Sequence, residues 1–236
     1  MLKYQTIADE LHHAILNGKY LPGSQLPLEK EMCEQYQVSR ITIKRAVDEL
    51  VKLGLVVKRR GSGTFVKTVD NSRLREFSMA HQFSGFVETF KGREVQTDVL
   101  KFEIKHPSEE VAVKLQISAE DFVYDIIRVR SLESQPMVIE YTNMPIQIVP
   151  GIRREVLENS IYHYIEDELK HRLQSAHRSV RAVMPTEEEK RYLKIEGILP
   201  LLEIEQVAFL DDGHPFEYSV ARHRSDKQTF FAVSIR

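Results

Sequence analysis

The chain has 236 residues, 42% of them hydrophobic, which is enough for one large or two modest domains with their own cores. No apolar run reaches the roughly 18 to 20 residues of a membrane span, so we expect no membrane partner and a cytoplasmic location. Cys33 is the only cysteine, which excludes an intrachain disulfide and a cluster of zinc-binding thiolates.

Charge is divided unevenly along the chain. Residues 1–67 hold 11 basic and 7 acidic side chains, a net charge of +4, whereas the remaining residues hold 22 and 28, a net charge of −6. The whole-chain net charge of −2 hides this difference. A basic head on an acidic body is typical of a protein in which one module alone attracts phosphate groups.

The first predicted element is a helix over about Gln5–Leu16. Apolar side chains recur there with helical spacing, and Asn17-Gly18 ends the helix. Pro22-Gly23 marks a turn, and a second short amphipathic helix follows Leu26-Pro27. A tight turn then leads into a third helix.

Ser39 stands where the N-cap of this third helix is expected, because its hydroxyl can accept a hydrogen bond from a first-turn backbone N–H. Gly54 ends the helix, as a left-handed C-terminal position prefers. One side of the helix is apolar, formed by Ile43, Ala46, Val47 and Leu50. The other side carries donors suited to phosphates and to guanine edges, namely Arg40, Thr42, Lys44 and Arg45.

A β-hairpin is predicted next. Leu55–Val57 and Thr64–Val66 have the composition of strands, and Gly61-Ser62-Gly63 supplies the positive-φ backbone of a tight tip. Lys58, Arg59 and Arg60 lie along its rim. This order of elements is typical of a winged helix-turn-helix, which places one helix in the DNA major groove and a hairpin beside it.

The sequence therefore predicts a module that binds duplex DNA. The candidate contacts are Ser39, Arg40, Thr42, Lys44, Arg45, Arg59, Arg60, Gly61 and Gly63. The alternative is that these basic residues are only the solvated side of an ordinary helix. The combination of helix, turn and basic hairpin favours DNA binding.

The rest of the chain predicts an α+β domain. Lys67–Met79 is polar and has the composition of a linker, so we expect domains at residues 1–67 and 81–236 joined by residues 68–80. Strands are predicted at Thr97–Ile104, Phe122–Leu132, Pro136–Pro145, Ser175–Val183, Leu201–Leu210, His214–Ala221 and Phe230–Ile235. Helices are predicted near Ser108–Lys114, Ile161–Leu169 and Thr186–Leu193. Strands in hairpin-like order favour an antiparallel sheet with flanking helices.

These motifs resemble a known family. The N-terminal part is similar to the GntR family of bacterial transcription regulators in Leu26-Pro27, Val38-Ser39-Arg40, Thr42, Ala46, Leu50, Gly54 and the run from Gly61 to Val66. The whole chain resembles the HutC subfamily, which joins that head to a UTRA domain of chorismate-lyase-like fold. The UTRA resemblance covers about 150 residues and is carried by Arg128-Val129-Arg130, Pro136-Met137, Ile139-Glu140, Ser160-Ile161-Tyr162, Phe216-Glu217-Tyr218-Ser219 and Thr229-Phe230.

Two departures from the family pattern concern DNA contacts. The family often begins its second helix with Pro-Ser-Glu-Arg, where this chain has Pro27-Leu28-Glu29-Lys30. Leu28 offers no N-cap oxygen, and Lys30 replaces an arginine fork with a point charge, so we expect a phosphate contact there. Lys44 likewise stands where arginine is common, which predicts a different operator preference.

The resemblance implies a small anionic effector in the C-terminal domain, commonly a phosphorylated sugar. Arg128 and Arg130 alternate on a strand, so both guanidinium groups face the same way and can hold a phosphate or carboxylate. Ser160 begins a helix whose first N–H groups favour an anion. The other candidate contacts are Ser84, which matches a small hydroxyl residue in relatives, Glu140, Tyr162, Glu217, and His223, which stands where related sugar-phosphate binders have tyrosine.

Other interpretations of these residues stay open. Arg128 and Arg130 can pair with Glu140 or Glu133 for structure alone, and Ser160 can be a simple N-cap. The chorismate-lyase-like fold raises an enzyme acting on a carboxylate substrate, although fold analogy is weak evidence for function. A third interpretation is a constitutive DNA-binding dimer without a ligand.

We therefore expect an effector-responsive repressor of carbohydrate uptake or breakdown genes rather than an enzyme. It would act as a homodimer that reads an inverted repeat in double-stranded operator DNA. No catalytic motif was found, the histidines are scattered, and we expect no metal and no cofactor.

Overall fold

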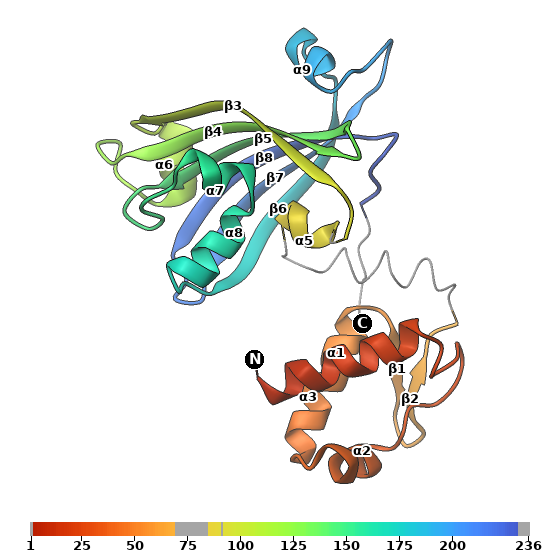
Figure 1. Cartoon of the computed structure of the whole chain (residues 1–236). Helices are drawn as coiled ribbons and strands as arrows, with labels where there is room; N and C mark the ends of the chain where they lie inside the picture. The colour runs from red at the N-terminus through yellow and green to blue at the C-terminus, as the bar shows by residue number, and fades with distance from the viewer. Residues whose placement is uncertain (1, 69–84, 91, 231–236) are drawn as a thin grey trace. The chain divides into compact units, whose positions relative to one another are not determined.

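The computed structural model describes residues 2–68, 85–90 and 92–230. The chain divides into two compact units, whose described parts are residues 2–68 with Phe230, and residues 85–90 with 92–229. Figure 1 shows the elements of both units. The predicted linker at residues 68–80 lies, apart from Thr68, outside the described residues, so the predicted domain boundaries stay predictions.

The N-terminal unit is a three-helix winged helix-turn-helix. Its elements are α1 (Lys3–Leu16), α2 (Glu29–Tyr36), α3 (Arg40–Lys52), β1 (Val56–Arg59) and β2 (Gly63–Val66). The apolar sides of the helices meet in one core, in which Ile43, Ala46, Val47 and Leu50 of α3 are fully buried. The residues predicted to form the apolar side of the third helix are therefore confirmed as core.

The C-terminal unit contains one six-stranded sheet and short helices. The strands are β3 (Val95–Lys105), β4 (Val123–Leu132), β5 (Gln135–Pro145), β6 (Leu173–Val183), β7 (Leu201–Leu210) and β8 (Pro215–Arg224). The helices are α5 (Gly85–Thr89), α6 (Glu109–Leu115), α7 (Arg154–Glu158), α8 (Ile161–His163), the π-helix η1 (Tyr164–Glu168) and α9 (Glu187–Tyr192). None of the described helices of the chain is long and apolar enough to cross a membrane.

The sheet has the order β3-β4-β5-β8-β7-β6, and every neighbouring pair is antiparallel. The chain passes through α6 between the neighbouring strands β3 and β4. Strands β5 and β8 are also neighbours, despite their distance in sequence. The pairing places residues in cross-strand rows. One row runs Arg128, Glu140, Ala221, Ile204 and Val180 across β4, β5, β8, β7 and β6.

The two faces of the sheet carry different chemistry. We call the face that carries Arg128 and Arg130 the arginine face and the opposite face the ion-pair face. Helices α7 and α8 pack with the apolar residues of the arginine face, whereas α6 contacts Tyr218 and Val220 of the ion-pair face. Figure 1 shows α7 and α8 in front of the sheet and α6 behind it.

Most predicted elements are present, with two differences. The helix predicted near Ile161–Leu169 is a three-residue α-helix followed by a π-helix, because the Leu169 N–H bonds to the Tyr164 carbonyl five residues back. Helices α5 and α7 were not predicted; each has five residues, too few to show a helical period. The strand predicted at Phe230–Ile235 lies, apart from Phe230, outside the described residues.

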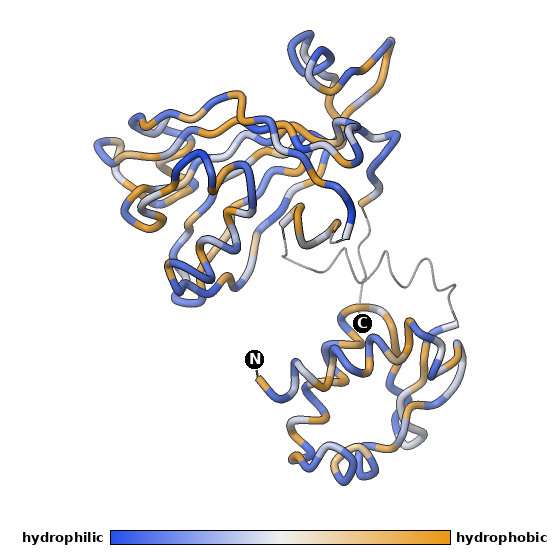
Figure 2. Tube along the Cα trace, viewed as in Figure 1, coloured by the Kyte–Doolittle hydropathy of each residue, from blue (hydrophilic) through white to orange (hydrophobic). Residues whose placement is uncertain are grey.

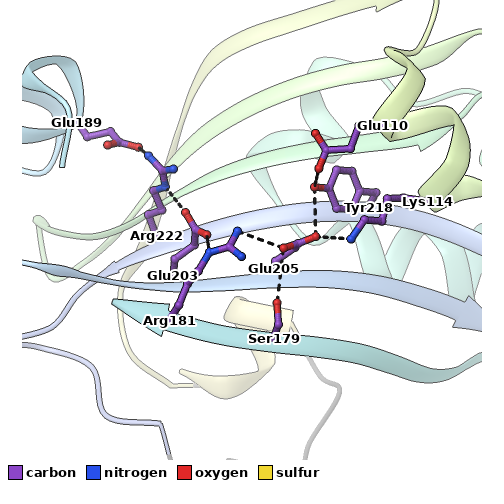
Figure 3. Close-up of polar contacts among 9 residues, drawn as sticks. All are labelled: Glu110, Lys114, Ser179, Arg181, Glu189, Glu203, Glu205, Tyr218 and Arg222. Carbon is purple, nitrogen blue, oxygen red and sulfur yellow. Dashed lines mark hydrogen bonds and ion pairs between the residues drawn. The ribbon is translucent and has the colours of Figure 1, made fainter. Parts of the chain in front are cut away.

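A continuous network of ion pairs crosses the ion-pair face (Figure 3). Arg222 of β8 bonds to Glu189 of α9 and to Glu203 of β7, at 2.7 Å in each case. Arg181 of β6 bonds to Glu203 and Glu205, and Glu205 in turn bonds to Lys114 of α6 and to Tyr218, which also donates to Glu110 of α6. Figure 2 shows α9 as predominantly hydrophilic, so this charged contact helps to fix a helix that has few apolar residues.

Replacing Arg222 should destabilise the C-terminal unit. The Glu189 side chain is 0% exposed and pairs with Arg222, so Arg222→Ala leaves this buried carboxylate without its cation, whereas Glu203 keeps Arg181. We expect a loss of about 3–5 kcal/mol in the free energy of unfolding, measured by urea denaturation. Arg181→Ala is the matched control and should cost about 0–1 kcal/mol, because this side chain is 56% exposed and its two carboxylates keep other cations, Glu203 with Arg222 and Glu205 with Lys114. Equal losses of unfolding free energy in the two variants would contradict the stabilising role given to Arg222.

Candidate functional site

The N-terminus of α3 is held by the predicted cap. The Ser39 hydroxyl accepts a hydrogen bond from the backbone N–H of Thr42 at 3.3 Å, and the two hydroxyls bond to each other at 2.9 Å. Gly54 follows the helix with a φ of 73°, as predicted. The cap fixes the direction in which the first turn of α3 points and engages the Thr42 hydroxyl.

The exposed side of α3 is basic at its N-terminal half. Lys44 and Arg45 are exposed, and Arg40 is directed toward α2 by an ion pair with Glu29, at 3.0 Å. Farther along, Asp48 pairs with Lys58 of the wing at 2.6 Å, so the C-terminal half of α3 is joined to β1. Cationic side chains are therefore concentrated at the end of α3 that enters the major groove in winged helix-turn-helix proteins.

Helix α2 lacks a side-chain cap, as the departure at Leu28 predicted. The Leu28 N–H instead donates to the Glu31 carboxylate at 2.7 Å, which retains half of a capping box. Lys30 is exposed in the first turn of α2. Its position is compatible with a contact to a phosphate.

The wing is held by an extended segment that precedes α2. The Gln25 side chain donates to the Ser62 carbonyl at 2.8 Å, and the Leu26 N–H bonds to the Thr64 carbonyl. Gly63 adopts a φ of 118°, and a Cβ there would lie 2.3 Å from Gln25 Nε2. Gly61 also has positive φ, with open space around it. The Gly-Ser-Gly tip thus needs glycine for two reasons, backbone conformation at both ends and close approach of Gln25 at one.

Both wing arginines are exposed. The Arg59 guanidinium lies over the Phe65 ring, 4.9 Å from its centroid, which orients the side chain without neutralising it. Arg60 follows at the turn. Together with α3, these residues form a basic surface from two elements of one unit.

In the C-terminal unit, the arginine face brings Arg128, Arg130 and Glu140 together. Arg128 Nη2 donates to Glu140 Oε2 at 2.8 Å, and Arg128 Nη1 donates to the Leu157 carbonyl at 3.1 Å. Arg130 Nη1 lies 3.9 Å from the same carboxylate oxygen. Burial acts to raise the pKa of Glu140, but the two arginines hold it below its ordinary value. The cross-strand pairing considered above is therefore present, yet one carboxylate faces two cations.

Several N–H groups of this cluster have no hydrogen-bond partner among the described residues. They are Arg128 Nε and Arg130 Nε and Nη2, all without exposed area. Arg130 is 2% exposed, and its guanidinium lies 5.0 Å from the centroid of the Phe86 ring of α5. Burial lowers the pKa of Arg130 to about 10, which Glu140 opposes and Arg128 reinforces. Buried guanidinium donors without partners are suited to an oxyanion.

A second polar cluster lies on the same face. Buried Glu217 accepts hydrogen bonds from Gln206 at 2.9 Å and Ser219 at 2.6 Å, and Gln206 also donates to the Tyr162 hydroxyl at 3.1 Å. Burial raises the pKa of Glu217 despite these bonds. Arg178 of β6 donates Nε to the Gln206 side-chain oxygen at 2.7 Å, which fixes the orientation of the amide. Such planar polar groups are suited to contacts with hydroxyls.

Three further effector contacts were predicted, at Ser160, His223 and Ser84. Ser160 caps α8, since its hydroxyl accepts from the His163 N–H at 3.3 Å, so the simple N-cap role is present. His223 lies beside Glu140, in the cross-strand row that also holds Val138. Burial lowers the pKa of His223 to about 4, so its imidazole is neutral at pH 7. Ser84 lies outside the described residues.

Sequence reasoning missed four residues of these clusters. Gln206 and Ser219 share the arginine face with Glu217, and Arg178 and Phe86 approach from β6 and α5. Gln206 had a signal, because it interrupts the apolar positions Ile204 and Ala208 on the buried side of a strand. Phe86 and Arg178 had none, since nothing local indicates which strand or helix they approach.

Known protein families match both units of the chain. Residues 3–66 match the model of the gntR family of bacterial regulatory proteins, and residues 91–229 match the UTRA domain. The chain belongs to the GntR family, with a HutC-type UTRA domain. It is therefore a DNA-binding transcriptional regulator with an effector-binding domain, and the expected α+β fold is confirmed.

Individual relatives cover the chain from end to end. It is 37% identical to the transcriptional regulator GmuR of Bacillus subtilis, with 100% of both chains covered. It is 34% identical to MngR of Escherichia coli, the mannosyl-D-glycerate transport/metabolism system repressor, over 99% of this chain and 96% of that one. The crystal structure of the possible transcriptional regulator YydK of B. subtilis matches all of both chains at 28% identity, with a TM-score of 0.79.

Gly63→Ala should weaken DNA binding through the wing. The added Cβ would displace Gln25 and break its bond to Ser62, so the tip should lose its fixed position. We expect at least about fivefold weaker binding to duplex DNA, measured by fluorescence anisotropy. Gly61→Ala is the matched control, because it strains the backbone without a steric clash, and it should have a smaller effect. Equal effects would show that the Gln25 contact does not matter.

Proposed function

We propose that this regulator is a repressor of carbohydrate uptake or breakdown genes, released from its operator by a phosphorylated sugar. The phosphate would bind at Arg128 and Arg130, and the sugar hydroxyls at Glu140, Glu217 and His223. Tyr162, Ser160 and Ser84 would complete the contacts.

The observation that carries this proposal is the set of buried guanidinium N–H groups without partners. An unpaired buried polar group is costly, and two cations that share one carboxylate leave a positive charge uncompensated. A phosphate group carries about −1.5 to −2 charge at pH 7 and offers several acceptor oxygens. Its binding would satisfy the donors and the charge together.

The second polar cluster supports a sugar as the remainder of the effector. Glu217, Gln206 and Ser219 offer carboxyl, amide and hydroxyl groups within one hydrogen-bonded set, and neutral His223 can both donate and accept. The relative MngR is the repressor of a mannosyl-D-glycerate transport/metabolism system, and mannosyl-D-glycerate is a sugar derivative. The same relative is a repressor, which supports that direction of control.

We also propose how the protein would be organised. A homodimer formed through the C-terminal units would present two winged helices to an inverted repeat, as helix-turn-helix dimers do. Effector binding would alter the spacing of the winged helices through the linker at residues 68–80. A coupling of about 1–3 kcal/mol is enough for a 5- to 150-fold change in operator affinity. The protein would act in the cytoplasm, by binding and not by catalysis.

A thermal-shift screen tests the proposal. Inorganic phosphate, sugar phosphates, free sugars and simple aromatic acids would be compared, and a ligand at 100 times its Kd should add about 2.7 kcal/mol of stability. We expect a response to one sugar phosphate that Arg128→Ala abolishes, while this variant still binds DNA but is not released. Arg128→Lys, which keeps the charge without the fork, should respond weakly.

Arg45→Ala and Arg59→Ala are the matched controls. They should weaken DNA binding and leave the thermal response to the sugar phosphate unchanged, because they lie in the other unit. A response to carboxylic acids alone would contradict the sugar proposal and favour an enzyme-like ligand. Normal release of Arg128→Ala by the effector would show that the site is elsewhere.

A further inference from the structure

Ile41 is an apolar side chain on the exposed side of the recognition helix. It is 69% exposed, whereas Ile43, two residues later, is fully buried. A β-branched residue is a slightly unfavourable choice within a helix, and here no burial in the unit offsets that cost. Neither the packing of α3 nor its charge explains an isoleucine at this position.

The surroundings of Ile41 place it among the DNA contacts. Lys44 and Arg45 follow three and four residues later, so all three side chains lie on one exposed stripe of α3. The polar side chains on either side of Ile41 already have partners within the unit, since Thr42 bonds to Ser39 and Arg40 pairs with Glu29. Ile41 is therefore the first side chain of the stripe, at the helix end that contacts base edges.

We propose that Ile41 reads the 5-methyl group of a thymine in the operator. Thymine alone among the four bases displays a methyl group in the major groove, and apolar side chains discriminate it by direct contact. Lys44 and Arg45 bind phosphates or guanine edges and do not distinguish thymine from uracil. Ile41 thus adds a base preference to a surface that is otherwise cationic.

The test removes the methyl group and nothing else. The full-length wild-type protein first selects its preferred duplexes from a randomised library. Each thymine of the selected site is then replaced by uracil, and affinity is measured by fluorescence anisotropy at fixed salt. We expect at least one position per half-site where uracil weakens binding about fourfold, the value for one buried methyl group.

The variants assign that methyl group to Ile41. Ile41→Ala should bind the thymine and uracil duplexes equally, while Ile41→Val should retain part of the preference. Ile198→Ala is the matched control, because this isoleucine is 88% exposed in the other unit, and it should behave as wild type. A uracil penalty that persists in Ile41→Ala, or no penalty at any thymine of the site, would overturn the inference.

Discussion

Two arginine side chains of one strand are buried side by side, and the C-terminal unit is arranged around them. Arg128 and Arg130 are 7% and 2% exposed, and burial of a charged group is costly unless it is paired. Glu140 on the neighbouring strand faces both of them, the Leu157 carbonyl accepts a hydrogen bond from Arg128, and the Phe86 ring lies against Arg130. These partners leave three guanidinium nitrogens without a hydrogen-bond acceptor among the described residues, and this is the observation on which the proposed anion site rests.

The local parts of this arrangement could be predicted from sequence. Alternation on a strand places Arg128 and Arg130 on one face, and Ser39 and Ser160 are recognisable as caps because capping depends on residues three positions away. The parts that could not be predicted depend on the pairing of strands that are distant in sequence. Gln206 reaches the site only because β7 pairs with β8 and β8 pairs with β5, and no local pattern specifies that order.

The two units differ in how their cationic side chains are exposed to solvent. In the N-terminal unit the cations stay exposed, and ion pairs such as Arg40–Glu29 and Asp48–Lys58 orient side chains at little cost. In the C-terminal unit the two arginines of the proposed effector site are buried and share one carboxylate, which would favour binding of an anion. On the proposed function, operator DNA would bind an exposed surface and the small anion a buried site, so the two ligands would not compete for the same groups.

Coupling between operator DNA and the effector can be measured through linkage, without knowledge of the structural path between the two sites. If a sugar phosphate lowers operator affinity, operator DNA must lower sugar-phosphate affinity by the same factor. The most direct measurement is calorimetric titration of the sugar phosphate into free protein and into the protein–operator complex. We expect weaker binding to the complex, by about 5- to 150-fold and equal to the effect of the effector on DNA affinity. Equal affinities for the free and operator-bound protein would contradict it.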